Sequence, residues 1–431
     1  MLSINTEYEL VTNQRQLRQW QRRLEKAKSF CCDTETTGLD AMAVDLVGVA
    51  ASVEEDGEIV SCYIPVGHRA RLGKQLDVNL VLDTFRPLIK RKPTVWHNAL
   101  YDMLVLGQDR YGVEFGNVHD SMFMAYALYS DQLPSLGMDY LAERFMEFKT
   151  IKFEDVVLNR PGRRDFRDVP LKEATEYAAE DTAITLALAK VFQRALKDQG
   201  LFEVYTRDRA LLSVLYSMKR NGVAVDLKLL AELEDTWAGE CADLVEKMFD
   251  AAGTQFNPAS SLQVLEVLEG RGLRIPFDKK TGKQSVDKHV LELLAGDEVV
   301  DLLLEYRGKS KLLSTYARAL PTKVRADTGR VHGNFPMTRT TTGRAASNDP
   351  NLQNIPTRTK DGEKLRSAFI AEPGNLLVCA DYSQIEYRVL AHVSKQPELI
   401  EAFHNGIDVH AQTMATIRGI PVDQVSKAER S

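Results

Sequence analysis

The chain has 431 residues, a formal net charge of −6, and 44% hydrophobic and 27% charged residues. This length is enough for several hydrophobic cores, so a single small domain is excluded. No segment reaches the roughly 18 to 20 apolar residues that span a bilayer, and the first residues lack the apolar run of a secretory signal. We therefore expect no membrane partner and a cytoplasmic location. The five cysteines are scattered, without a C-x-x-C pair, which argues against a zinc or redox centre.

The charge is unevenly distributed along the chain. Between Glu305 and Arg366 there are 13 Lys and Arg against 5 Asp and Glu, a local excess of +8 in an otherwise acidic protein. Such a segment is typical of a basic groove, although a solvated charged face would look the same.

The first third of the chain alternates β-rich and helical segments, which predicts an α/β domain with a mixed sheet. The predicted strands are Ser29–Asp33, Asp45–Val53 and Glu58–Ile64, the last two joined by an acidic turn that contains Gly57. The predicted helices are Leu80–Lys90, Ala99–Arg110, Asp120–Tyr129 and Lys172–Lys197.

From about residue 201 the pattern is almost wholly helical and predicts an elongated arm. It is interrupted at Asn221-Gly222, at Asn257-Pro258 and between Arg274 and Gly282. The polar stretch TRTTTGRAASNDPNLQNIPTRT follows, and a loop of this length usually binds a ligand. We then expect a buried strand at Leu376–Ala380 and a helix that begins at Ser383.

The motif FCCDTETTGLD contains two acids that are two residues apart at the end of a strand. The side chains of Asp33 and Glu35 should therefore lie on one face, where their charges repel unless a cation neutralises them. In VWHNALYDMLVL a strand turns into a helix, and Asn98 and Asp102 should share one side of that helix because they are four residues apart. Each pattern alone is common at exposed strand ends and helix caps.

The helix containing EYAAEDTAITLAL has Tyr177 and Asp181 on one face, again four residues apart. Taken in order, Asp33, Glu35, Asp102, Tyr177 and Asp181 resemble the three exonuclease motifs of the DEDD superfamily, in its tyrosine-bearing variant. The segments DTETTGLD and YAAEDT are especially similar to the DNA polymerase I family. This resemblance implies a ribonuclease H-like domain that removes nucleotides from single-stranded or frayed 3′ ends.

The chemistry of phosphodiester hydrolysis explains a set of acids. Two divalent ions about 4 Å apart can activate water and stabilise the leaving oxygen, and Mg²⁺ prefers oxygen ligands. The resemblance implies two Mg²⁺ ions, for which Mn²⁺ can substitute. One is held by Asp33, Glu35 and Asp181, while the other shares Asp33 and is reached by Asp102 through water.

The same resemblance assigns roles to neighbouring side chains. Tyr177 would orient the attacking water rather than act as a base, because a phenol has a pKa near 10. Leu39 would wedge beside the terminal base, and Asn98 would contact the DNA strand.

The segments TGRAASNDPNLQNIPTR and VCADYSQIEYRVLAH resemble the palm of family A DNA polymerases. Asp381 would then be a metal ligand and catalytic residue of a polymerase site. Glu386 would exclude the ribose 2′-hydroxyl, although its spacing from Ser383 also fits a capping box of the S-x-x-E form, and both roles stay open.

Four further contacts with nucleic acid or nucleotide, and a role for the helical arm, follow from this resemblance. Arg344 would reach the minor groove at the primer terminus, and Gln384 would lie near the template–primer end. Arg358 and His410 would approach the phosphates of the incoming nucleotide. The helical arm would be the thumb, whose basic residues would grip the duplex: Arg307, Lys309, Lys311 and Arg318.

The resemblance divides the chain into an exonuclease domain at 1–200, a helical thumb at 201–325, a partial α+β palm with motif A at 326–395 and the start of the fingers at 396–431. The sequence contains no His-Asp-Glu motif, which in this family supplies the second metal-binding acid of the polymerase site. A split enzyme completed by a second polypeptide, an interrupted gene and a shortened chain all stay open. The layout without a 5′-nuclease domain looks more like that of a phage enzyme, and the expected location is the cytoplasm of a prokaryotic or phage-infected cell.

The predicted function is the N-terminal portion of a DNA polymerase with a proofreading exonuclease, whose partners are primer–template DNA, single-stranded 3′ ends and dNTPs. The alternative is a stand-alone 3′→5′ exonuclease that uses the palm remnant as a DNA-binding platform. A regulatory DNA-binding remnant is disfavoured, because the set of acids is complete.

Overall fold

The computed structural model describes residues 3–277, 282, 284–357 and 359–426. The chain forms two compact units, Met1–Ile370 and Ala371–Ser431, and each is described by itself. In the described part of the chain, no helix is both long and apolar enough to cross a membrane.

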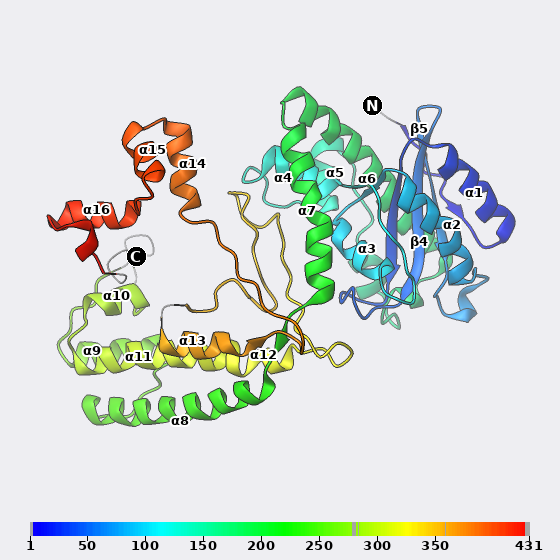
Figure 1. Ribbon diagram of the computed structural model, residues 1–431. Helices are drawn as coiled ribbons and strands as arrows, with labels where there is room; N and C mark the ends of the chain where they lie inside the picture. Colours follow the sequence, from blue (N-terminus) through cyan, green and yellow to red (C-terminus); the bar gives the residue numbers. More distant parts are fainter. Residues whose placement is uncertain (1–2, 278–281, 283, 358, 427–431) are drawn as a thin grey trace. The chain divides into compact units, whose positions relative to one another are not determined.

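Within the described residues, the first unit begins with a mixed seven-stranded sheet (Figure 1). Its strands are β1 (Ser3–Ile4), β2 (Glu9–Leu10), β3 (Phe30–Thr36), β4 (Leu46–Glu55), β5 (Glu58–Pro65), β6 (Thr94–Trp96) and β7 (Val118–Asp120). They are arranged in the order β1-β5-β4-β3-β6-β7, and β2 also pairs with β5. The pairs β3–β4 and β4–β5 are antiparallel and the others parallel, so the predicted mixed sheet is confirmed.

Seven long helices accompany this sheet in the described chain. They are α1 (Gln14–Lys26), α2 (Val78–Arg91), α3 (Ala99–Leu106), α4 (Ser121–Tyr129), α5 (Met138–Met146), α6 (Leu171–Asp198) and α7 (Phe202–Asn221). Helix α6 packs directly on β3, β4 and β5, because its small Ala and Thr side chains allow a close approach. Helix α7 contributes Tyr205, Leu212 and Leu215 to the same core, so it packs on the sheet although our predicted domain boundary precedes it.

The strands and helices predicted for the first third are all present. The largest difference is α3, which ends at Leu106 rather than Arg110 because Gly107 is its C-cap. Helix α4 begins where Asp120 accepts hydrogen bonds from the backbone N–H groups of Met122 and Phe123, an N-cap that an Asp before an apolar run predicts.

The rest of the first unit contains the predicted helical arm. Its helices are α8 (Leu227–Ala252), α9 (Ser261–Gly270), α10 (Lys288–Leu293), α11 (Glu298–Leu312), α12 (Ala319–Thr322) and α13 (Lys360–Ser367). Helices α8 and α11 lie side by side (Figure 1), and two short strands, β8 (Ala224–Val225) and β9 (Phe369–Ile370), pair antiparallel beside them. The predicted breaks near Asn221 and Asn257 both lie between helices.

The second unit contains α14 (Ile385–Ser394), α15 (Pro397–His404) and α16 (Val409–Arg418). Our prediction of a buried strand at Leu376–Ala380 is wrong: the segment is irregular, Leu376 is 90% exposed and Val378 is 88% exposed. A strand needs a partner for its backbone N–H and C=O groups, and the described residues of this unit provide no strand to pair with it.

The predicted start of the following helix is also wrong by two residues. Helix α14 begins at Ile385, and its N-cap is Gln384 in the left-handed region, with φ 51° and no side-chain capping bond. The capping-box register that we predicted from Ser383 and Glu386 therefore does not describe this helix start. Glu386 lies in the first turn of the helix.

Candidate active site

Three acidic side chains from two elements converge where α6 packs on β3. Asp33 and Glu35 extend from β3, and Asp181 extends from α6, which packs on that strand. One carboxylate oxygen of each residue lies within 4.8 Å of the others. The predicted shared face of Asp33 and Glu35 is therefore confirmed, and the fold adds Asp181 to it.

The surroundings of these acids oppose their ionisation. Burial raises the pKa of Asp33 to about 7. The pKa values of Glu35 and Asp181 are raised well above their usual range, first by burial and then by the negative charge of Asp33. Three such acids cannot all be charged unless a cation lies among them.

The donor set fits a divalent cation that prefers oxygen. All three groups offer carboxylate oxygens, and Oδ1 of Asp181 is buried without a hydrogen-bond partner among the described residues. A buried carboxylate oxygen without a partner is costly, and a metal ion would satisfy it. The described chain can therefore hold a metal ion at this point.

Asp102 lies beside this group but is not part of it. Its Oδ1 accepts hydrogen bonds from the backbone N–H of Thr34 at 3.0 Å and from the Thr34 hydroxyl at 2.6 Å. The carboxylate is 2% exposed, and it is near enough for its charge to contribute to the raised pKa of Glu35. Thr34, which sequence reasoning did not single out, thus holds the fourth acid against β3.

Tyr177 lies one helical turn before Asp181 on α6, as predicted from their spacing. Its pKa is raised by burial and by the nearby carboxylates of Asp181, Glu35 and Asp33. The ring packs against Phe166 at 5.8 Å and Phe153 at 6.4 Å between centroids. The tyrosine is therefore held neutral and directed at the acidic group.

Asn98 does not share a helix face with Asp102, so that expectation was wrong. Asn98 precedes α3 and adopts a left-handed conformation with φ 60°. The carboxylate of Asp120 accepts hydrogen bonds from the N–H groups of Asn98 and Ala99, so this buried acid caps α3 as well as α4. Asp120 was predicted only as the start of a helix, and its second role depends on tertiary contacts.

Leu39 is 94% exposed and follows a turn that is tied to α3. The hydroxyl of Tyr101 donates to the carbonyl of Gly38 at 2.6 Å and shares a hydrogen bond with the Thr36 hydroxyl. An exposed leucine on a fixed turn is available for a ligand. Tyr101 was missed at the sequence level, although it directly precedes Asp102.

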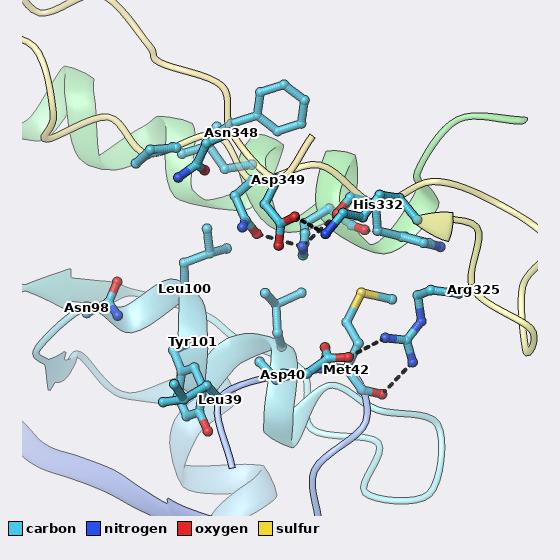
Figure 2. A pocket seen from close by; sticks show the side chains of 18 of the residues that line it. Leu39, Asp40, Met42, Asn98, Leu100, Tyr101, Arg325, His332, Asn348 and Asp349 are labelled. Carbon is cyan, nitrogen blue, oxygen red and sulfur yellow. Dashed lines mark hydrogen bonds and ion pairs between the residues drawn. The ribbon is translucent and has the colours of Figure 1, made fainter. Parts of the chain in front are cut away.

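A cavity of about 570 Å³ lies beside Leu39 within the first unit (Figure 2). Its lining includes Leu39, Asn98 and Tyr101. The lining also contains four basic residues, Lys219, Lys323, Arg325 and Arg339. Figure 2 shows Arg325 bonded to the loop after Leu39: its guanidinium donates to Asp40 at 2.7 Å and to the carbonyl of Met42 at 3.5 Å.

The residues predicted for the polymerase site are distributed over both units. Arg344 is exposed in the long loop of the first unit, and Arg358 lies outside the described residues. Asp381 is exposed in the second unit, and in the described chain it is not one of the acids grouped closely enough to share a metal ion.

Two further predicted residues come together in the second unit. The side-chain amide of Gln384 donates to Asp408 at 2.6 Å, which joins the start of α14 to the start of α16. His410 is exposed, and its ring packs edge-on against Tyr387 at 4.8 Å between centroids. Their predicted contacts with DNA and nucleotide stay predictions.

The basic side chains predicted for the thumb are mostly engaged within the arm. Lys309 pairs with Glu240 at 2.5 Å and Asp361 at 3.0 Å, and Arg318 pairs with Glu234 at 3.0 Å. Arg307 donates to a backbone carbonyl, while Lys311 is exposed.

Comparison with known proteins identifies both parts of the chain. The model of the 3'-5' exonuclease family matches residues 8–197, and that of DNA polymerase family A matches residues 227–431. The chain is 39% identical over 412 residues to DNA polymerase I of Rhizobium leguminosarum, an alignment that covers 91% of this chain and 40% of that protein. Residues 227–431 thus match DNA polymerase family A, and residues 8–197 match the 3'-5' exonuclease family.

Further similarities of the chain agree with these two family matches. It is 35% identical over 438 residues to DNA polymerase I of Pseudomonas aeruginosa, covering 100% of this chain and 48% of that protein. A solved structure, the POL domain of Pol1 from M. smegmatis in complex with DNA primer-template and dNTP, aligns with a TM-score of 0.81 and 26% identity over 98% of this chain and 69% of that one.

The chain thus spans less than half the length of these two curated relatives. Both relatives are bacterial. Neither the phage-like interpretation nor a second polypeptide gains support from these similarities.

Proposed function

We propose that this chain is the proofreading and primer-binding portion of a family A DNA polymerase, acting in DNA replication or repair. Its activity would be metal-dependent 3′→5′ hydrolysis of single-stranded or frayed ends. The observation that carries the proposal is the convergence of Asp33, Glu35 and Asp181 within 4.8 Å of one another.

The metal requirement follows from the chemistry of that group. We propose two Mg²⁺ ions, with Mn²⁺ as a substitute, which when bound would supply a nucleophile at neutral pH and stabilise the leaving oxygen. Asp33, Glu35 and Asp181 would hold one ion, and Asp33 and Asp102 would serve the second. Their raised pKa values in the absence of metal support a site built for cations.

The remaining side chains would orient the substrate. Tyr177 stays neutral because its pKa is raised, so its hydroxyl can direct a water molecule without taking up its proton. Leu39 would pack against the terminal base. The four basic residues that line the adjoining cavity would attract the phosphates of a single strand, without preference for sequence.

The finer organisation belongs to the same proposal. We assign a ribonuclease H-like exonuclease domain to residues 1–200, the thumb to 201–325, the partial palm to 326–395 and the start of the fingers to 396–431. The expected location is the bacterial cytoplasm. The partners would be primer–template DNA and dNTPs, with Arg344, Arg358, Gln384, Glu386 and His410 near them.

A second candidate is a 3′→5′ exonuclease that uses the palm only to bind DNA. The observation in its favour is Asp381, which in the described chain belongs to no group of three or more side chains that could hold a metal ion. Primer extension distinguishes the two candidates: extension with dNTPs supports a polymerase, and trimming without extension supports the alternative.

The decisive experiment removes the acids without changing their shape. Asp33→Asn combined with Glu35→Gln should abolish release of nucleotides from a labelled single-stranded oligonucleotide in the presence of Mg²⁺. A matched control is Asp56→Asn with Glu58→Gln, an acidic pair of the same spacing at the turn between β4 and β5. Hydrolysis that survives in the first variant would refute the assignment.

A further inference from the structure

The long polar loop that contains Arg344 is attached to the core of the predicted exonuclease domain. Phe335 and Met337, at the start of this stretch, pack against the hydrophobic core that surrounds the large sheet. Thr338 follows, and its hydroxyl donates to the sulfur of Met122 on α4 at 3.8 Å. The loop is thus anchored by residues more than 200 positions earlier in the chain.

The hydroxyl group of one tyrosine forms hydrogen bonds with two backbone groups of this loop. Tyr126, on the same helix α4, is only 7% exposed. Its hydroxyl donates to the carbonyl of Thr340 at 2.5 Å and accepts from the backbone N–H of Gly343 at 3.1 Å. The Thr340 hydroxyl in turn donates to the carbonyl of Arg344 at 2.6 Å.

These bonds determine the backbone on both sides of the turn before Arg344. Gly343 has φ +80°, a conformation that glycine adopts readily and that directs the next residue. An exposed loop of polar residues would otherwise exchange these backbone bonds for water and sample many conformations. The tyrosine therefore selects one of them.

We infer that Tyr126 is a positioning residue for Arg344, so that helix α4 of the exonuclease domain sets the loop that grips the primer end. This inference rests on the proposed function, in which Arg344 contacts the minor groove of the primer terminus. The loop that binds a paired primer and the acids that trim a frayed one are then both held by the same core of helices and strands.

The test is Tyr126→Phe, which removes the hydroxyl and keeps the ring. Binding of a fluorescent primer–template duplex and of a single-stranded oligonucleotide is measured by anisotropy at one fixed salt concentration, using the full chain. We expect duplex affinity to fall roughly tenfold, since two hydrogen bonds that order the loop are lost, and single-strand affinity to change far less. The matched control is Tyr129→Phe, on the same helix, whose ring stacks on Phe145.

A modified primer reports on the position of Arg344 itself. Replacing the terminal guanine by 3-deazaguanine removes the N3 acceptor from the minor groove. This should weaken duplex binding by the unmodified chain but have little further effect on Tyr126→Phe. The inference is overturned if the modified base weakens binding by Tyr126→Phe as much as binding by the unmodified chain. It is also overturned if Tyr126→Phe loses single-strand and duplex affinity equally. A merely structural role of Tyr126 would produce either result.

Arg344→Ala separates the inference from the proposed function. If Arg344→Ala weakens duplex binding and Tyr126→Phe does not, the inference is wrong and the proposed role of the loop stands. If Arg344→Ala binds the duplex as the unmodified chain does, the proposed role of Arg344 itself fails. We expect Tyr126→Phe, Arg344→Ala and the double variant to lose the same amount of duplex affinity, so that the two single losses do not add.

Discussion

Ionisation of Asp33 should oppose folding when no cation is bound. Burial raises its pKa from the ordinary value of 3.8 to about 7, so the folded state binds this proton more tightly than the unfolded state. The contribution of the group to stability is therefore fully present below about pH 4 and is lost as the pH rises through about 7. Asp33→Asn keeps the shape of the side chain and removes the charge, so it should remove this loss.

The magnitude follows from the difference in pKa. About three pKa units correspond to about 4 kcal/mol. Solvent reaches Asp33 in part, and Glu35 and Asp181 compete for the same protons, so we expect roughly half of that value to be observed. Without metal, the unfolding free energy of the variant should rise above that of the unmodified chain as the pH increases from about 5 to about 8. The difference should be roughly 2 kcal/mol at the upper end of this range.

The assay is urea unfolding in the presence of a chelator, followed by tryptophan fluorescence. Trp20 and Trp96 are fully buried in the exonuclease core, and Trp237 is buried in the arm. Both chains therefore also contain Trp237→Phe, so that the signal reports on the exonuclease domain alone. Each curve is measured at several pH values, without and with Mg²⁺.

Mg²⁺ should reverse the order of stability. Binding to the folded state stabilises the unmodified chain, and this gain grows with pH as the acids ionise, whereas Asp33→Asn should gain little. The control is Asp56→Asn, in the exposed turn between β4 and β5, which should follow the unmodified chain. A difference between Asp33→Asn and the unmodified chain that stays constant from about pH 5 to pH 8 would refute the reasoning.

Three further predictions concern single side chains near the acids. Tyr177→Phe should lower kcat for 3′ trimming roughly tenfold and leave KM unchanged, because one hydrogen bond to the attacking water is lost; a change confined to KM would contradict this role. Leu39→Ala should raise KM several-fold while the unfolding free energy changes by less than about 0.5 kcal/mol, because Leu39 is 94% exposed; unchanged steady-state kinetics would exclude contact with the terminal base. Thr34→Val removes a hydroxyl that donates to Asp102 at 2.6 Å and should lower kcat roughly tenfold without loss of fold by circular dichroism; full activity would show that this bond does not position the acid.

The candidate site was largely predictable because its residues lie in short, regular segments. The D-x-E spacing on a strand placed Asp33 and Glu35 on one face, and the four-residue spacing on a helix did the same for Tyr177 and Asp181. Asp102 was identified only as a member of the ordered set, because its partner Thr34 is 68 residues away in the sequence. The failure for Asn98 has a local cause: Asn98 precedes α3, which starts at Ala99, and it adopts a left-handed conformation that the pattern of apolar residues does not reveal.

The predictions for the palm were weaker for a different reason. An apolar run such as Leu376–Ala380 has the composition of a buried strand, but composition does not provide the neighbour that a strand must pair with. The loop of Arg344 was predicted to be a binding segment from its length and polarity. Its attachment to Tyr126 could not be recognised, because no local pattern connects residues so far apart.

The sequence by itself determined the predicted strands and helices of the first third of the chain and the shared faces of Asp33 with Glu35 and of Tyr177 with Asp181, because side-chain direction follows from backbone periodicity over a few residues. Only the tertiary structure decided that β3 and α6 meet at one point, that Thr34 holds Asp102, and that α4 supports the loop of Arg344. These contacts join residues distant in the chain, and they depend on how the helices pack on the sheet.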